Sequence, residues 1–260
     1  MNQDIKRISY SEYKNWHECP YRHKLIYIDK LPYFSGNEHT AFGTAIHKAC
    51  EEMMENNSIS GFKIFQKSFE EELQILQDSG LSINQDLVND MTDQATRICE
   101  NVVPAINENF SNYELISVEE PLLEEIRDFN SYDRKFKGFI DLVIKTGDQY
   151  HIIDWKTCSW GWPSRKKTDK IVTSQLSLYK KFYSDKHNID SKKINTYFVL
   201  LKRTASRDNV EIVKVSSGDK KVKNSLKSLE NAVINIERKM HIKNRLSCKY
   251  CKFYKTKYCE

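Results

Sequence analysis

Two short segments of this sequence end in acidic residues that could bind a divalent metal ion. Asp141 closes an apolar stretch that begins at Gly138, and Asp154 follows the apolar pair 152–153. Two carboxylates at close range repel each other unless a cation lies between them, and their oxygen atoms suit Mg²⁺ or Mn²⁺. Lys156 lies two residues after Asp154, so both side chains leave the same face of a strand. A cation there could assist a metal-activated water and hold a phosphate oxygen.

Strands must bring these residues together. We expect one strand over 135–146 and another over 150–156, joined by a turn at Gly147 and Asp148. In such a hairpin the strands are neighbours, so Asp141 and Asp154 lie side by side. Each segment alone also fits an ordinary turn aspartate and a solvated lysine. The interpretation therefore depends on the pairing of the two strands.

Four sequence blocks, in this order, resemble the PD-(D/E)XK nuclease superfamily. The blocks are a helical Gly-to-His block at 43–47, the segment 138–141, the D-x-K segment 154–156 and a Q-x-x-x-Y helix at 175–179. The pattern is closest to the RecB-like, AddB-like iron–sulfur exonuclease branch and is also similar to CRISPR adaptation nucleases. With the cysteines, the resemblance spans residues 9 to 259.

The resemblance implies a role for each block. Lys156 would be the catalytic lysine, and Gln175 and Tyr179 would turn polar groups toward the site from one helix face. The expected ligands of Mg²⁺ or Mn²⁺ are His47, Asp141, Asp154 and the backbone carbonyl of Trp155. From the residues alone, His47 on an apolar helix is more often a core histidine than a ligand, and Tyr179 could simply be a core residue. Glu119 or Glu120 could add a further carboxylate.

The cysteines form a second chemical signal. Cys248, Cys251 and Cys259 crowd the end of the chain, and Cys19, which precedes Pro20, is the natural fourth ligand. Four thiolates fit either tetrahedral zinc or an iron–sulfur cluster, and the spacing alone favours zinc. The resemblance instead implies a [4Fe–4S] cluster, although the last interval is longer than the family's usual one. Cys50 and Cys99 lie on apolar helix stripes and should be buried small hydrophobes.

Two segments mix basic and aromatic residues, as single-stranded DNA sites do. The segment 160–167 follows the strand of Asp154, and the segment 249–258 surrounds the final cysteines. Lysine and arginine neutralise phosphates while aromatic rings stack on unpaired bases. The alternative is a solvated loop whose rings pack inward. The candidate DNA-binding residues in the first segment are Trp160, Trp162, Arg165, Lys166 and Lys167.

The remaining pattern predicts one α/β domain over residues 1–260. Residues 1–110 should be helical, 111–216 should form the sheet core, and 217–260 should hold a long helix and the cysteine-rich tail. The resemblance implies a restriction-endonuclease-like central mixed sheet flanked by helices. We expect helices at 11–16, 20–28, 40–53, 62–80, 85–110, 173–184 and 222–240, and further strands at 115–118, 196–202 and 210–215.

Composition limits the class of protein. With 39% hydrophobic and 30% charged residues and a net charge of +5 over 260 residues, the chain is neither a disordered polyelectrolyte nor low-complexity. The sequence has no apolar run long enough for a transmembrane helix and no secretory signal, so we expect an intracellular, cytoplasmic protein.

The function implied by the resemblance is a metal-dependent deoxyribonuclease. It would be an exonuclease for single-stranded or frayed DNA ends in recombination, repair or replication. No P-loop motif is present, so a helicase or recombination partner would be a separate protein. The alternatives are a CRISPR-adaptation-like trimming nuclease and a non-catalytic iron–sulfur or zinc DNA-binding module.

Overall fold

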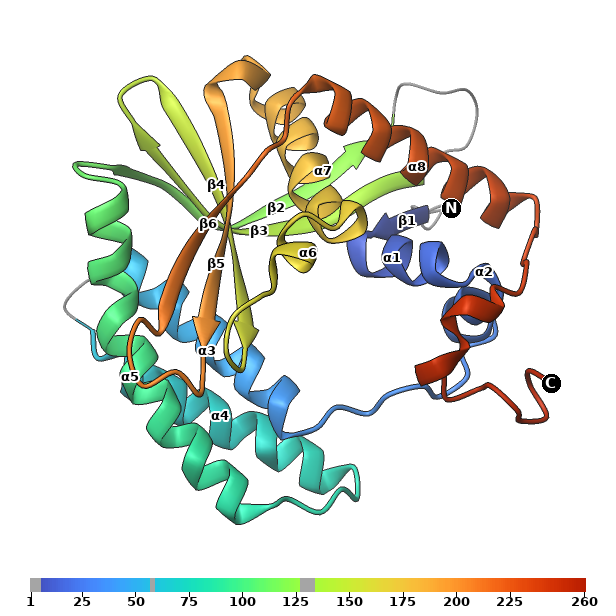
Figure 1. Cartoon of the computed structure of the whole chain (residues 1–260), viewed down its shortest axis with the longest axis horizontal. Helices are drawn as coiled ribbons and strands as arrows, with labels where there is room; N and C mark the ends of the chain where they lie inside the picture. Colours follow the sequence, from blue (N-terminus) through green and yellow to red (C-terminus); the bar gives the residue numbers. More distant parts are fainter. Residues whose placement is uncertain (1–5, 57–58, 127–133) are drawn as a thin grey trace, which may run out of the picture. The chain divides into compact units, whose positions relative to one another are not determined.

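The computed structural model describes residues 6–56, 59–126 and 134–260. Its backbone contacts divide the chain into two compact units. We call them the central unit (Ser35–Glu120 and Phe139–Gly218) and the terminal unit (Met1–Phe34, Pro121–Gly138 and Asp219–Glu260). Figure 1 gives the element labels used below.

A mixed sheet forms the middle of the central unit. Strand β3 (Arg134–Thr146) runs into this unit and pairs antiparallel with β4 (Gln149–Cys158), with Leu142 opposite Ile153. Strand β4 pairs parallel with β5 (Ile194–Lys202), and β5 pairs antiparallel with β6 (Val210–Val215). Strand β2 (Glu114–Glu125) also pairs with β3. The hairpin predicted between the two acidic segments is therefore confirmed.

Three long helices pack against one face of this sheet: α3 (Glu38–Glu55), α4 (Gly61–Asp78) and α5 (Gln85–Asn109). Ile153 and Trp155 of β4 point into the core that these helices share. Because side chains alternate along a strand, Asp154 leaves the opposite face. Helix α7 (Lys170–His187) meets that side chain there, and the short helix α6 (Ser164–Lys167) precedes it.

Both ends of the described chain belong to the terminal unit. Strand β1 (Lys6–Ser9) pairs parallel with residues 134–137 of β3. Helix α1 (Tyr10–Glu18) follows, then α2 (Pro20–His23) and a π-helical turn (Lys24–Ile28). The C-terminal part consists of α8 (Asp219–Glu237), a 3₁₀ segment (Arg245–Tyr250) and a series of turns.

Ion pairs connect the two ends of the chain within this unit. Glu237 at the end of α8 lies 2.9 Å from both Lys6 and Arg134, and the Tyr13 hydroxyl donates to Ser228 at 2.8 Å.

In the described part of the chain, no helix has the length and apolar character needed to cross a lipid bilayer.

Most predicted elements are confirmed, and the differences have local causes. Ser9 rather than Ser11 caps α1, and Asn37 caps α3 because its side chain and that of Thr40 bond each other's backbone amides in a capping box. The sequence analysis missed β1 and the single turn of α6, since four-residue elements carry too little periodicity to detect.

Candidate active site

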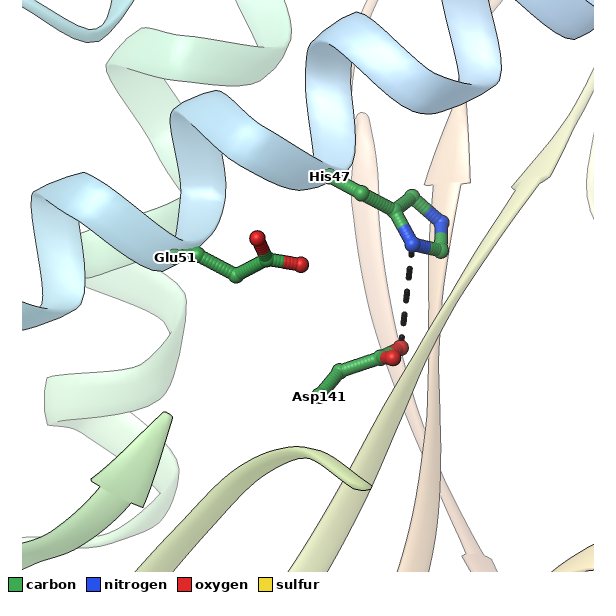
Figure 2. Close-up of side chains that lie close together, drawn as sticks. All are labelled: His47, Glu51 and Asp141. Atoms are coloured by element: carbon green, nitrogen blue, oxygen red, sulfur yellow. Dashed lines mark ion pairs between the residues drawn. The ribbon is translucent and has the colours of Figure 1, made fainter. Parts of the chain in front are cut away.

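Helix α3 presents two ligand-type side chains to the end of β3. His47 and Glu51 are four residues apart and share one helix face. The Nδ1 atom of His47 lies 3.8 Å from Oδ2 of Asp141, and Glu51 lies beside them (Figure 2). One ligand atom from each of the three residues falls within 4.8 Å of the others. The structure thus brings together the two predicted ligands His47 and Asp141 and adds Glu51, which the sequence analysis did not include.

Asp154 is 1% exposed and is held by two neighbours. Lys156 Nζ lies 2.5 Å from its Oδ2, and the Gln175 side-chain amide donates to its Oδ1 at 2.7 Å. The same amide donates to the Tyr179 hydroxyl at 3.1 Å. The two residues of the Q-x-x-x-Y pattern thus lie beside the D-x-K segment, as predicted.

Trp155 connects the two carboxylates through the backbone. Its N–H donates to Asp141 Oδ2 at 2.7 Å, which fixes that carboxyl beside the residue following Asp154. Its indole ring is fully buried in the core. The arrangement holds the two carboxyl groups close enough for Asp154 to affect the ionisation of Asp141.

Burial dominates the ionisation of this site. It raises the pKa of Asp141 well above its usual range, and the neighbouring Asp154 carboxyl raises that pKa further. Burial also raises the pKa of Asp154, while the Lys156 ammonium opposes the shift. For His47, burial and then the positive charge of Lys156 lower the pKa to about 3. His47 is therefore neutral at neutral pH, which is the form that binds a metal.

Glu51 extends the cluster toward β2. Burial raises its pKa to about 8, and the adjacent Glu119 adds to the shift. Glu119 adopts a left-handed conformation with φ of 50°, uncommon for a residue other than glycine. Glu120 points elsewhere and accepts from Lys186 and His187 at 2.7 and 2.8 Å. The i+4 spacing from His47 was the one sequence signal that could have identified Glu51.

These side chains fit a divalent metal ion. A neutral imidazole and several carboxylates are ligands that Mg²⁺ and Mn²⁺ accept. The raised carboxyl pKa values show that negative charge is unfavourable here without a cation, and a bound cation removes that penalty. The chemistry of the donor set therefore agrees with the metal site expected from the sequence.

The four predicted cysteines line one pocket of the terminal unit. Two hydrogen bonds between side chain and backbone connect its N-terminal and C-terminal residues: the Asn244 N–H donates to Cys19 Sγ at 3.4 Å, and the Ser247 hydroxyl donates to the Glu18 carbonyl at 2.6 Å. Arg22, itself 7% exposed, lines the same pocket and can balance thiolate charge. Cys50 and Cys99 are buried in the helical core, as predicted.

The two tryptophans after β4 have different environments. Trp160 is 75% exposed, whereas Trp162 is 8% exposed and its ring lies 5.2 Å from that of Phe198. The expectation that Trp162 stacks on a base is therefore wrong, because its ring packs inward. Lys166 Nζ lies 4.3 Å from the Trp162 ring centroid, and Lys167 pairs with Glu211.

Comparisons with known proteins agree with this geometry. The family model of the PD-(D/E)XK nuclease superfamily matches residues 7–256, so the chain belongs to that superfamily. A crystal structure of a "Putative exonuclease" from Eubacterium rectale superposes with a TM-score of 0.58 and 11% identity, covering 95% of this chain and 86% of that one. This likeness shows a shared fold.

A second structure, of SSO0001, gives a TM-score of 0.44 at 14% identity, over 97% of this chain and 86% of that one. No curated protein matches the chain.

Proposed function

We propose that this chain is a divalent-metal-dependent deoxyribonuclease that hydrolyses phosphodiester bonds at single-stranded or frayed DNA ends. One observation carries the proposal: His47, Asp141 and the Asp154–Lys156 pair occupy one site in a chain of the nuclease superfamily. The protein from Eubacterium rectale that is described as a "Putative exonuclease" shares the fold, which agrees with the exonuclease proposal. Recombination, repair or replication would be the setting, with a separate helicase to unwind duplex DNA.

The metal would be held by side chains already close together. His47 and Asp141 would bind Mg²⁺ or Mn²⁺, with Asp154, the Trp155 carbonyl and Glu51 as the remaining donors. A bound ion supplies Lewis-acid chemistry, activating water at neutral pH and withdrawing charge from the phosphate. Asp141 is oriented for this role because the Trp155 N–H fixes its carboxyl.

Lys156 would act on the reacting phosphate. Its ammonium group lies beside Asp154 and is partly exposed, so it can contact a phosphate oxygen and orient the attacking water. A fixed positive charge stabilises the negative charge that develops in the transition state. Gln175 would keep the Asp154 carboxyl in place, and Tyr179 would hold the Gln175 amide in turn.

We assign the cysteine pocket to a [4Fe–4S] cluster rather than zinc. Cys19, Cys248, Cys251 and Cys259 line one pocket of the terminal unit, so one metal centre could be shared by all four thiolates. Four thiolates suit either zinc or iron–sulfur chemistry, and the resemblance of the cysteine pattern to that of iron–sulfur nucleases supports the cluster.

A nuclease assay with matched lysine variants tests the active site. Lys156→Ala should lower the cleavage rate by about 100-fold, the scale for loss of one preorganised charge. Lys145→Ala is the control: its side chain is 30% exposed against 29% for Lys156, it lies on the neighbouring strand, and it also faces a carboxylate. Cleavage should require added Mg²⁺ or Mn²⁺.

The ligand variants complete the test. Asp141→Ala should abolish cleavage yet leave DNA binding nearly unchanged, because it removes a metal ligand and no basic group. Equal rates for wild-type protein, Asp141→Ala and Lys156→Ala would contradict the assignment of the site.

A further inference from the structure

The positive charge of this protein is concentrated in its last residues. Residues 238–259 contain eight lysines and arginines and no acidic residue, which leaves 33 basic against 36 acidic residues elsewhere. Without this segment the chain would carry a net negative charge. A local excess of this kind attracts a polyanion, while the rest of the molecule repels it.

Aromatic rings are interleaved with these charges. Tyr250 is 80% exposed, and Tyr254 and Tyr258 are 39% and 40% exposed. A lysine ammonium lies over each ring: Lys249 over Tyr250 at 5.1 Å, Lys255 over Tyr254 at 5.5 Å and Lys257 over Tyr258 at 5.1 Å from the ring centroids. We define the tail surface as Lys249, Tyr250, Tyr254, Lys255, Lys257 and Tyr258.

The fold of the tail separates this surface from the core. Phe253, in the same segment, is 5% exposed and packs with Leu25 and Cys259. Hydrogen bonds from Tyr254 N–H to the Cys251 carbonyl and from Lys255 N–H to the Cys259 carbonyl hold the turns. One ring therefore anchors the segment while three tyrosines remain at the surface.

Two further ring–lysine pairs flank the tail surface in the same unit. Lys252 lies 5.3 Å from the ring centroid of Phe34, which is 52% exposed, and Lys243 lies 4.9 Å from that of Tyr21. Among the described residues of this unit, four exposed rings and the half-buried ring of Tyr21 therefore each have an adjacent ammonium group. Each such pair offers a stacking face and a phosphate contact within the reach of one nucleotide.

We propose that the tail surface is a binding site for single-stranded DNA, with tyrosines stacking on bases and lysines contacting phosphates. The proposal rests on the nuclease function above and names a second place where the substrate is held. Single strands fit better than a duplex, because only unpaired bases expose faces to an aromatic ring. Tyr250 ends the six-residue 3₁₀ segment, and Tyr254 and Tyr258 lie among turns, so these three rings do not form the long apolar helix face of a membrane anchor.

Binding of a fluorescent oligothymidylate to the full-length protein, without added divalent metal, tests the lysines. The double change Lys249→Gln and Lys257→Gln should weaken binding and reduce the salt slope by about 0.7 for each phosphate that is no longer neutralised. The control is Lys63→Gln with Lys67→Gln, two exposed lysines of α4, which makes the same charge change elsewhere. The control should bind like wild type.

Tyrosine variants separate stacking from general apolar contact. Tyr250→Leu should weaken binding about 5-fold or more, the low end for loss of one stacked base, whereas Tyr250→Phe should retain affinity. Thermal unfolding and metal content of each variant, compared with wild type, show that the fold is intact.

Two results would overturn the proposal. One is wild-type oligonucleotide affinity in the lysine and tyrosine variants. The other is loss of binding to phosphatidylglycerol vesicles in the lysine variant while oligonucleotide affinity persists, which would make a membrane the occupant. Because binding is measured without cleavage, failure of the nuclease proposal would appear separately, as wild-type protein that binds DNA but does not cut it.

Discussion

At the scale of single residues, the candidate site is defined by groups whose ionisation is unfavourable without a partner. Burial and the approach of Asp154 raise the pKa of Asp141, and burial with the nearby Glu119 raises that of Glu51 to about 8. Lys156 supplies one positive charge, which is not enough for the buried carboxyl groups of Asp141 and Asp154 together with the half-buried Glu51. A divalent cation would supply the rest, so metal binding and proton release should be coupled.

Glu51 provides a test of this coupling through stability. Its folded pKa of about 8 lies above its ordinary value of 4.5, so its contribution to stability is fully present below pH 4.5 and is lost as pH rises toward 8. The carboxylates that act on it are Glu119, Glu52 and Glu55, and it also lies beside His47 and Asp141. We expect metal-free Glu51→Gln to be more stable than wild type at pH 8, with the difference shrinking toward pH 5.

Urea unfolding in the presence of a chelator measures this difference. Glu52→Gln is the matched comparison: the Glu52 carboxylate raises the pKa of Glu51 less than burial and Glu119 do, so its effect at pH 8 should be smaller than that of Glu51→Gln. Added Mn²⁺ should reverse the order at pH 8, since wild type would then use the Glu51 carboxylate as a ligand. Identical pH profiles for wild type and Glu51→Gln would show that Glu51 is not part of the charged cluster.

At the scale of elements, periodicity made the strands and long helices predictable. The prediction of strand 210–215 matches β6, and that of helix 85–110 matches α5 to within one residue. The alternation of Ile153, Asp154 and Trp155 also places the carboxylate and the ring on opposite faces, as the structure does. Regular elements with one apolar face can therefore be predicted from sequence.

Tertiary contacts between elements could not be predicted from the sequence in the same way. Glu51 belongs to the site only because Glu119, from β2, and Asp141, from β3, converge on it, and nothing near it in sequence indicates either contact. Trp162 is buried because Phe198, from β5, lies beneath it. A mixture of basic and aromatic residues has the same appearance in sequence whether the ring packs inward or outward.

Variants of Trp160 and Trp162, the two tryptophans near α6, test which ring is exposed and which ring packs inward. Trp160→Ala should weaken binding to single-stranded DNA by about 1–3 kcal/mol if the exposed ring stacks on a base. Trp162→Ala should instead lower the free energy of unfolding by about 3–5 kcal/mol, because it removes a buried aromatic ring. Oligonucleotide titration and urea unfolding of both variants check the pair. The reverse result, with Trp162 affecting binding and Trp160 affecting stability, would contradict the burial seen here.

At the scale of the whole molecule, the cysteines connect residues that are far apart in sequence. Cys19 and the three C-terminal cysteines enclose more than 200 residues of chain, yet line one pocket of the terminal unit. The free energy of binding a metal centre there becomes free energy of folding for that unit. Loss of the centre should therefore act on the terminal unit before it acts on the active-site residues, which belong to the central unit.

The identity of the centre can be tested by metal analysis of anaerobically purified protein. A [4Fe–4S] cluster predicts brown protein with about four iron atoms per chain. Cys248→Ser should lose the colour, whereas Cys50→Ser should keep it because Cys50 is buried in the helical core of the other unit. Colourless protein with one zinc ion would remove the iron–sulfur assignment and leave the proposed nuclease site untouched.

Hydrogen exchange on Cys248→Ser locates the structural effect of losing the centre. Amides of α1, α2 and the C-terminal turns should exchange faster than in wild type, because the metal-ligand bonds would be lost. Only weaker contacts, such as the hydrogen bond from Ser247 to Glu18, would then hold these segments together. Amides of β4 and β5 should keep their protection, because the hydrophobic core of the central unit holds them. Cleavage by Cys248→Ser at low temperature should then persist, as His47, Asp141 and Lys156 keep their places. Uniformly faster exchange in both units, with cleavage lost at every temperature, would show instead that the whole chain folds around the cysteine pocket.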